Sequence, residues 1–262
     1  MTEVGKMVLA PVTITEEQRR QYQEEGYFIL EGVISAEVLE GLRAECDRLV
    51  RQKDEELARR GVESEGITHR GSRYFISSHG HDSETLERFL FSDLMASICL
   101  ATLGPDAYLF NEQFVVKRDR AGMRFAWHQD SGYIGHPHRP YLSCWCALDD
   151  VSEENGTVYI LPYSRAGTRE WTPHRKEEGS NDLVGYFGDD PGIPVVGPAG
   201  TIAVFSSVTF HRSGANTSPH LRRIYLAQYS AEPILNKEGT ALWHWADPFL
   251  KGGRRVDPFV SR

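Results

Sequence analysis

The chain has 262 residues, of which 40% are hydrophobic and 25% are charged, and its formal net charge is -8 at pH 7. This composition is typical of a globular protein and excludes a disordered or fibrous one. The acidic balance, without a long basic run, argues against nucleic-acid binding. No apolar stretch is long enough to span a bilayer, and residues 1–12 lack the charged and apolar regions of a signal peptide. We therefore expect a cytoplasmic protein with neither a nucleic-acid nor a membrane partner.

The chain is predicted to begin with a short helix followed by a strand. Thr15 and Gln18 have the spacing of a capping box, in which each side chain bonds the backbone amide of the other residue. The helix should end near Gly26, and the apolar run over residues 27–30 should form a strand. Ser35 is placed to cap a second, longer helix, because apolar residues recur at helical spacing after it.

Two more segments complete a helical N-terminal part over about residues 14–104. Residues 61–83 are polar and rich in Gly, Ser and His, which predicts a loop. A third helix should run from about residue 84 to residue 103, where a Gly-Pro pair ends it.

From residue 107 the pattern changes to short runs rich in β-branched and aromatic residues, separated by Gly, Pro, Asn and Asp. The spacing of these runs suits an antiparallel sandwich or jelly roll rather than alternating β-α units. We expect one domain over residues 1–262, mostly β with flanking helices, whose core covers about 105–233 and whose C-terminal tail covers 234–262. The expected strands lie near residues 107–118, 123–130, 141–149, 156–161, 194–196, 201–205, 208–211 and 222–230.

A long charged stretch interrupts the β-rich part between Thr168 and Pro194. It has few apolar residues to anchor it, and loops of this length within a domain are usually functional lids or disordered segments. We expect it to cover the active site and to be mobile without substrate.

The motif Trp127-His128-Gln129-Asp130 is the first indication of chemistry. If this motif lies on a strand, His128 and Asp130 point to the same side, because side chains alternate between the faces of a strand. Two histidines and one carboxylate form a ligand set that leaves open positions on a non-haem iron(II) ion. A single His-x-Asp pair is a weak signal, since a histidine beside aromatic residues on a strand is usually a hydrogen-bonded core residue.

Three later segments strengthen the metal interpretation. An apolar run leads to His211 at the start of a turn of small residues, which makes His211 a candidate third ligand. Arg222 follows eleven residues later at the start of a strand, where its guanidinium could hold a carboxylate through two parallel hydrogen bonds. Asn155 and Gly156 should form a tight turn that closes a hairpin beside the site.

Four stretches carry a family resemblance that extends over most of the chain. They are ITEEQRRQYQEEGYFILEGVIS (14–35), WHQD (127–130), WCALDDVSEENGTVYILPYSRAG (145–167) and HRSGANTSPHLRR (211–223). In these stretches the chain resembles the phytanoyl-CoA dioxygenase (PhyH) family of iron(II)- and 2-oxoglutarate-dependent oxygenases. The resemblance implies a double-stranded β-helix core, which is a cupin-like jelly roll.

The resemblance also implies which residues bind the metal and the far end of 2-oxoglutarate. His128, Asp130 and His211 match the iron ligands of the family. Arg222 matches the arginine that grips the far carboxylate of 2-oxoglutarate. Arg223 is its rival, because neighbours on a strand face opposite sides, and the spacing favours Arg222.

Three further residues match positions that contact small molecules in the family. Trp145 matches a tryptophan that lines the 2-oxoglutarate pocket. Gln113 and Lys117 lie on the strand before the metal loop, where family members contact the co-substrate or the substrate.

Substrate contacts are expected from the loops around the site. Arg73 is a candidate for holding an anionic substrate group, with a surface arginine as the alternative. Tyr133, in the loop after Asp130, is a second candidate. His136 and His138 in the same loop imitate a metal pair, but solvated loop histidines are the favoured interpretation.

The resemblance implies an enzyme that binds iron(II), 2-oxoglutarate and O2 and oxidises a C–H bond of a small molecule, by hydroxylation in the default case, with release of succinate and CO2. Asp130 stands where halogenating relatives carry a small residue, so we expect oxygenation rather than halogenation. Secondary-metabolite biosynthesis is one expected setting. Two alternatives stay open: a non-catalytic, cupin-like metal-binding or sensing module, and a zinc-dependent hydrolase that uses the same three residues.

Overall fold

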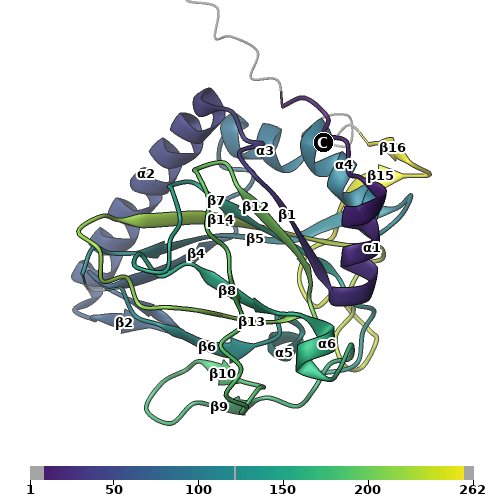
Figure 1. Ribbon diagram of the computed structural model, residues 1–262. Coiled ribbons are helices and arrows are strands. Elements are labelled where there is room, and N and C mark those ends of the chain that lie inside the picture. Colours follow the sequence, from purple (N-terminus) through teal and green to yellow (C-terminus); the bar gives the residue numbers. More distant parts are fainter. Residues whose placement is uncertain (1–8, 121, 257–262) are drawn as a thin grey trace, which may run out of the picture.

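The structure of the protein is a computed structural model and describes residues 9–120 and 122–256. Two antiparallel sheets form its centre (Figure 1). The larger sheet has the strand order β1 (Tyr27–Leu30), β12 (Ile202–Ser206), β7 (Leu142–Ala147), β14 (Arg222–Ser230), β5 (Ala107–Lys117), β4 (Arg73–Ser77), β3 (Thr68–His69) and β2 (Ser64–Glu65). A further strand, β15 (Asp247–Lys251), pairs with both β5 and β16 (Arg254–Arg255). The smaller sheet has the order β11 (Ile193–Pro194), β8 (Val158–Leu161), β13 (Phe210–Ser213) and β6 (Phe125–His128). This arrangement confirms the predicted, mostly β jelly roll.

The space between the two sheets holds a hydrophobic cluster to which both contribute. Trp145 and Leu226 come from the larger sheet, and Val158 and Ile160 come from the smaller one. Because side chains alternate along each strand, the opposite face of the larger sheet needs a separate cover.

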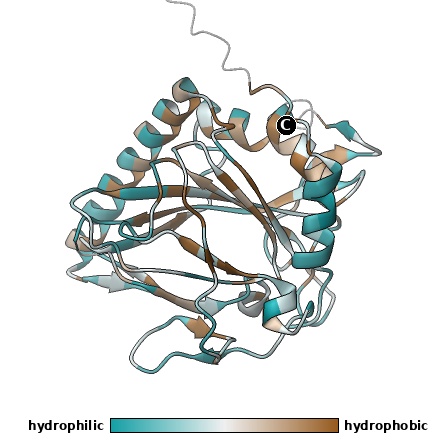
Figure 2. Ribbon diagram, in the orientation of Figure 1, coloured by the Kyte–Doolittle hydropathy of each residue, from teal (hydrophilic) through white to brown (hydrophobic). Residues whose placement is uncertain are grey.

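Helices supply that cover (Figure 1). Leu42 and Cys46 from α2 (Ala36–Arg60) and Phe89 from α3 (Glu84–Leu90) belong to one buried cluster with Phe114 of β5 and Tyr225 of β14. By contrast, α1 is hydrophilic over most of its length (Figure 2) and has no buried residue. The helices of the described residues are α1 (Glu16–Glu25), α2 (Ala36–Arg60), α3 (Glu84–Leu90), α4 (Asp93–Thr102), α5 (Ser131–Ile134) and α6 (Tyr163–Ala166). None of them is both long and apolar enough to cross a membrane.

The helix signals near the N-terminus are confirmed, but the predicted third helix was wrong. Thr15 and Gln18 form the capping box at the start of α1, and Ser35 caps α2. The segment predicted as one helix from residue 84 to 103 is divided into α3 and α4. Ser92 Oγ accepts from the amide of Met95 at 3.3 Å, so it caps a new helix inside the segment.

Several short strands lie where no strand was predicted. The predicted loop over 61–83 contains β2, β3 and β4, and the C-terminal tail contains β15 and β16. Most of these strands are only two residues long, so they show too little alternation to be recognised. The signal-peptide expectation concerns residues 1–12, of which residues 1–8 lie outside the described part.

Candidate active site

Three side chains converge from two neighbouring strands of the smaller sheet. His128 ends β6 and His211 lies on β13, and the two residues are direct partners in the pairing of these strands. Asp130 follows two residues after His128. One side-chain atom of each residue lies within 4.8 Å of the other two, and all three residues are buried. A group of this kind could hold a metal ion.

Asp130 reaches the histidines by a different route from the predicted one. Strand β6 ends at His128, and Asp130 has helical dihedral angles (φ −58°, ψ −36°) before the short helix α5. The expectation that His128 and Asp130 share one strand face was therefore wrong, although the side chains still meet. Asp130 Oδ1 lies 3.7 Å from His128 Nε2 and 3.4 Å from His211 Nε2.

Both histidines direct the same ring nitrogen toward Asp130. His128 Nδ1 donates to the carbonyl oxygen of Ala126 at 2.8 Å, and His211 Nδ1 donates to that of Thr209 at 3.0 Å. Because a carbonyl only accepts, the proton lies on Nδ1 and the lone pair of Nε2 is left for a metal. Burial lowers the pKa of His128 well below its ordinary value, and the neighbouring His211 lowers it further, which favours the neutral, ligating form.

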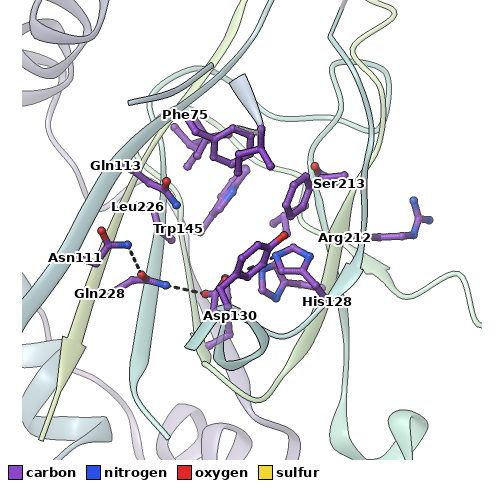
Figure 3. A pocket seen from close by; sticks show the side chains of 18 of the residues that line it. Phe75, Asn111, Gln113, His128, Asp130, Trp145, Arg212, Ser213, Leu226 and Gln228 are labelled. Atoms are coloured by element: carbon purple, nitrogen blue, oxygen red, sulfur yellow. Dashed lines mark hydrogen bonds and ion pairs between the residues drawn. The ribbon is translucent and has the colours of Figure 1, made fainter. Parts of the chain in front are cut away.

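Asp130 is held as a carboxylate. Burial raises the pKa of its carboxyl group, but His211, His128 and a hydrogen bond from Ser143 outweigh burial and lower the pKa to about 2. Asp130 Oδ2 accepts from Ser143 Oγ at 2.5 Å. It also accepts from Gln228 Nε2 at 2.9 Å, a bond that Figure 3 shows. Oδ1 faces the two Nε2 atoms and is left, like them, for a metal. Two imidazoles and one carboxylate are a donor set that fits iron(II).

A cavity of ≈ 220 Å³ lies beside these three residues, between the two sheets (Figure 3). Gln113, Lys117, Trp145 and Arg222, the residues expected to contact 2-oxoglutarate, all line it, and so does Tyr133. Their individual roles stay predictions, but the fold places them around one cavity.

Arg222 lines the cavity with part of its guanidinium unpaired. The residue is 1% exposed. Nη2 donates to the carbonyl oxygen of Gly156 at 3.1 Å, whereas Nε and Nη1 have no hydrogen-bond partner among the described residues. The guanidinium carbon lies 5.6 Å from the centre of the Trp145 ring. Arg223 faces the other way, as alternation predicts, and bonds Asp149 at 2.8 Å.

The turn predicted at Asn155 and Gly156 forms and supports this arginine, but the expected hairpin was wrong, because β7 and β8 on either side of the turn belong to different sheets. Asn155 Oδ1 accepts from the amide of Ser152 at 3.0 Å, and Gly156 has a φ of +77°. A Cβ atom at Gly156 would lie 2.6 Å from the carbonyl oxygen of Gly214, so only glycine fits there. The turn thereby places the Gly156 carbonyl oxygen against Arg222.

Lys117 is a second buried basic residue beside Arg222. The two residues are direct partners in the pairing of β5 with β14. Lys117 Nζ donates to Ser213 Oγ at 2.7 Å and to the carbonyl oxygen of Gly214. Burial lowers the pKa of Lys117 well below its ordinary value, and the positive charges of Arg222 and Arg73 lower it further. No carboxylate of the described residues bonds Lys117 or Arg222, so this wall of the cavity favours a bound carboxylate.

Arg73 is not placed to hold an anionic substrate group, which corrects the expectation from the sequence. It is 1% exposed, and its guanidinium donates to the two carboxylate oxygens of Asp182 at 2.9 and 2.8 Å. It also donates to the carbonyl oxygens of Ile67 and Arg124. The charge of Arg73 is therefore neutralised inside the protein. The sequence did not reveal this pair, because Asp182 lies 109 residues further along the chain.

The insert over 168–194 is tied to the core by this ion pair and by other contacts. It contains a two-stranded hairpin, β9 (Arg175–Lys176) with β10 (Leu183–Val184). His174 Nε2 accepts from the amide of Gln129 at 2.9 Å, and the amide of Leu183 donates to the Tyr133 hydroxyl at 3.3 Å. Because Tyr133 also lines the cavity, these contacts support a position of the insert beside the site. The mobility of the insert stays a prediction.

The ring nitrogens of His136 and His138 are used within the protein. His136 Nε2 bonds the carbonyl oxygen of Leu235 at 2.9 Å, and His138 Nε2 bonds Ser131 Oγ at 2.9 Å. Each Nδ1 also bonds a backbone carbonyl oxygen. The arrangement favours the interpretation of these two histidines as ordinary loop residues.

Four further residues belong to the site but did not stand out in the sequence. Asn111, Gln228 and Trp243 line the cavity, and Ser143 bonds Asp130. Alternation along β14 could have identified Gln228, since it shares a strand face with Arg222. Trp243 lies beyond the predicted core and had no such signal.

The chain is similar to known proteins over most of its length. A family model described as phytanoyl-CoA dioxygenase (PhyH) matches residues 22–224. An ectoine dioxygenase of Bordetella parapertussis is 29% identical, with 85% of this chain and 78% of the relative covered. A probable alpha-ketoglutarate-dependent hypophosphite dioxygenase of Stutzerimonas stutzeri is 28% identical, with 82% and 78% covered. The crystal structure of EctD from S. alaskensis, with 2-oxoglutarate and 5-hydroxyectoine, shares the fold with a TM-score of 0.67 at 18% identity, over 96% of this chain and 93% of that one.

Proposed function

Because the chain belongs to the phytanoyl-CoA dioxygenase (PhyH) family, we propose that His128, Asp130 and His211 hold iron(II) and that the cavity beside them binds 2-oxoglutarate. The chain is an iron(II)- and 2-oxoglutarate-dependent oxygenase that acts on a small molecule. The reaction that we propose is hydroxylation of a C–H bond, with release of succinate and CO2.

The observation that carries this proposal is the unpaired charge of Arg222 in the same cavity as the three ligands. Its Nε and Nη1 atoms are buried without a partner among the described residues, and Lys117, a second buried basic residue, lies beside it. A carboxylate could accept from both guanidinium nitrogens through charge-assisted hydrogen bonds. 2-Oxoglutarate has a carboxylate at each end, so Arg222 can bind one while the keto acid is left for the metal.

The side chains of the cavity have distinct tasks in this proposal. Bound iron(II), together with 2-oxoglutarate and O2, supplies the oxidant for the C–H bond. Arg222 and Lys117 bind and orient the far carboxylate. Phe205, Ile224 and Leu226 line the cavity with apolar surface, which excludes water and strengthens each electrostatic contact inside.

The substrate side of the cavity is aromatic and neutral, which supports a ring-bearing organic substrate. Phe75, Phe125, Tyr133, Tyr141 and Trp243 contribute aromatic surface there. Among the described residues of the lining, the only other basic side chain besides the Arg222–Lys117 pair is that of Arg212, which points away from the other labelled side chains (Figure 3). A role in secondary-metabolite biosynthesis fits this lining and is part of the proposal.

The zinc hydrolase alternative is less well supported. Such an enzyme needs a general base near the metal-bound water. Among the described residues that line the cavity, Asp130 is the only carboxylate, and it is one of the three ligands. The alternative of a non-catalytic module is an outcome of the experiment below.

The test is succinate formation from 2-oxoglutarate under air with added iron(II). This assay needs no known substrate when the enzyme converts 2-oxoglutarate to succinate without one. We expect activity in the wild type, none in His128→Ala, and a strong decrease in Arg222→Ala. His136→Ala and Arg223→Lys are matched controls, because these residues bond other parts of the protein and do not line the cavity. Both controls should retain wild-type activity.

A second measurement is needed for the case in which the enzyme converts 2-oxoglutarate only when its substrate is bound, because such an enzyme would form no succinate in this assay. The iron(II)-loaded protein without O2 should develop a charge-transfer absorption band on addition of 2-oxoglutarate, and His128→Ala should not. A folded wild type that forms neither succinate nor this band would support the non-catalytic module instead.

A further inference from the structure

Among the described residues, hydrogen-bond donors reach only one of the two carboxylate oxygens of Asp130. Oδ2 accepts from Ser143 Oγ at 2.5 Å and from Gln228 Nε2 at 2.9 Å. Gln228 Nε2 also donates to Ser143 Oγ at 3.0 Å, which closes a triangle of hydrogen bonds. Oδ1 lies 3.4 Å from His211 Nε2 and 3.7 Å from His128 Nε2. The carboxylate therefore has an inner oxygen for a metal and an outer oxygen held by the protein.

The outer oxygen is held by residues in one row across three strands. Gln228 of β14 is the direct partner of Ser143 on β7 and of Asn111 on β5. Gln228 Oε1 accepts from Asn111 Nδ2 at 2.7 Å (Figure 3). This bond directs the oxygen of the Gln228 amide toward Asn111 and its donating nitrogen toward Asp130. Gln228 and Ser143 are buried, at 4% and 0% exposure, so water does not compete for these bonds.

We propose that Ser143, Gln228 and Asn111 form a positioning row that presents Asp130 to the metal through Oδ1 alone. This inference rests on the proposed iron site. A carboxylate with two free oxygens can bind a metal ion through both and occupy an additional coordination position. Two donors on Oδ2 use its lone pairs and fix the plane of the carboxylate. The row thereby keeps open the positions that 2-oxoglutarate and O2 require.

Asn111 connects the row to the substrate side of the site. Its side chain lines the cavity, and it is the outer end of the chain of bonds that leads through Gln228 to Asp130. None of the three residues of the row is one of the proposed ligands, so each acts through Asp130 and is a positioning residue.

The test is an anaerobic titration of the metal-free chain with cobalt(II), followed by quenching of tryptophan fluorescence, because Trp145 lines the cavity. Gln228→Met and Ser143→Ala each remove a donor to Oδ2 while nearly preserving size. We expect roughly 10- to 100-fold weaker cobalt(II) binding in both variants, the usual effect of losing a partner that orients a metal ligand. Ser143→Thr keeps the hydroxyl group and should restore the affinity.

Ser230→Ala is the matched control for Ser143→Ala. Ser230 is also a buried serine, on β14, but it does not line the cavity and no hydrogen bond of the described residues joins it to Asp130. Its cobalt(II) affinity should equal that of the wild type. A second readout is the visible spectrum of bound cobalt(II), whose intensity falls as the coordination number rises. If Oδ2 is released to the metal, the spectrum of Gln228→Met should be weaker than that of the wild type.

The outcomes separate this inference from the proposed function. A wild type whose cobalt(II) binding does not depend on His128 would overturn both. Binding that depends on His128 but is unchanged in folded Gln228→Met and Ser143→Ala would overturn the positioning row alone. Urea unfolding of the metal-free variants tests for a merely structural role. With such a role, the stability would fall while the cobalt(II) affinity and spectrum of the folded fraction stayed unchanged. That result would also contradict the inference.

Discussion

Strands β5 and β14 carry different kinds of side chain on their two faces. Toward the helices, Phe114 and Tyr225 stack with their ring centres 4.2 Å apart, and both are fully buried. Toward the cavity, Lys117, Arg222 and Gln228 are almost as buried, at 1%, 1% and 4% exposure, but they are polar. One face of the same strands packs the core and the other forms the site, because successive side chains alternate between faces.

Burial therefore has opposite effects on the two sides of the larger sheet. Toward the helices, burial of apolar area contributes to the free energy of folding. Toward the cavity, burial of cations without a counter-ion opposes folding, yet the low dielectric there strengthens the attraction for a carboxylate. We expect substitutions on the first face to lower stability and leave binding intact, and substitutions on the second face to do the reverse.

The largest expected effect lies on the helix-facing side. Phe114→Ala should lower the free energy of unfolding by about 3–5 kcal/mol, because it leaves a cavity beneath α3 next to Tyr225. The affinity of the folded, iron-loaded protein for 2-oxoglutarate should not change. Urea unfolding measures the first quantity, and anaerobic titration of the charge-transfer band measures the second.

Phe114→Leu is the milder variant for the case in which Phe114→Ala does not fold. It should lose less stability and bind 2-oxoglutarate as the wild type does. A loss of affinity in this variant comparable to that of a cavity-facing substitution would show that the two faces are not independent.

Arg222→Met should have the next largest effect, and it should concern binding. Loss of a charged hydrogen-bond donor to a carboxylate costs about 1.5–3 kcal/mol, which corresponds to roughly 10- to 150-fold weaker 2-oxoglutarate binding. The free energy of unfolding without 2-oxoglutarate should be unchanged or higher, since Nε and Nη1 of Arg222 are already unpaired. A clear loss of stability without a change in affinity would contradict the assignment of this side chain to binding.

The sequence predicted those parts of this arrangement that depend on local spacing. The capping box at Thr15 and the bounds of β14 follow from residues close together in the chain. Alternation predicted that only one of Arg222 and Arg223 faces the cavity, and the spacing favoured Arg222; Arg222 lines the cavity, and Arg223 bonds Asp149 on the other side. The turn at Gly156 was recognised from its residue type, and its positive φ confirms it.

The remaining features depend on pairings between distant segments. Asp182 neutralises Arg73 from 109 residues away, and no local pattern marks the pair. The bond between Asn111 and Gln228 requires the order and register of β5 and β14, which alternation does not provide. Asp130 meets the histidines although it lies beyond the end of β6, because a short helix begins there. Local signals thus predicted most of the longer elements, and the pairing of elements determined the details of the site.

The smallest expected effect is that of Lys117→Met, and it should have opposite signs for stability and for binding. Burial lowers the pKa of Lys117 in the folded protein below its pKa in the unfolded chain. At any pH between these two pKa values, the unfolded chain therefore binds more protons at this residue than the folded protein does. The contribution of Lys117 to the free energy of unfolding thus increases with pH between the two pKa values, and it is least favourable to folding below both of them. Replacement by Met removes the buried charge and should raise stability by about 1 kcal/mol at neutral pH, and by less as the pH approaches 10.5.

Urea unfolding without 2-oxoglutarate at several pH values measures this gain, while titration with 2-oxoglutarate should give weaker binding than in the wild type. If Lys117→Met lowered stability instead, the hydrogen bonds of Lys117 with Ser213 and Gly214 would outweigh the cost of burying its charge, and the cavity-facing side would contribute to folding as the helix-facing side does.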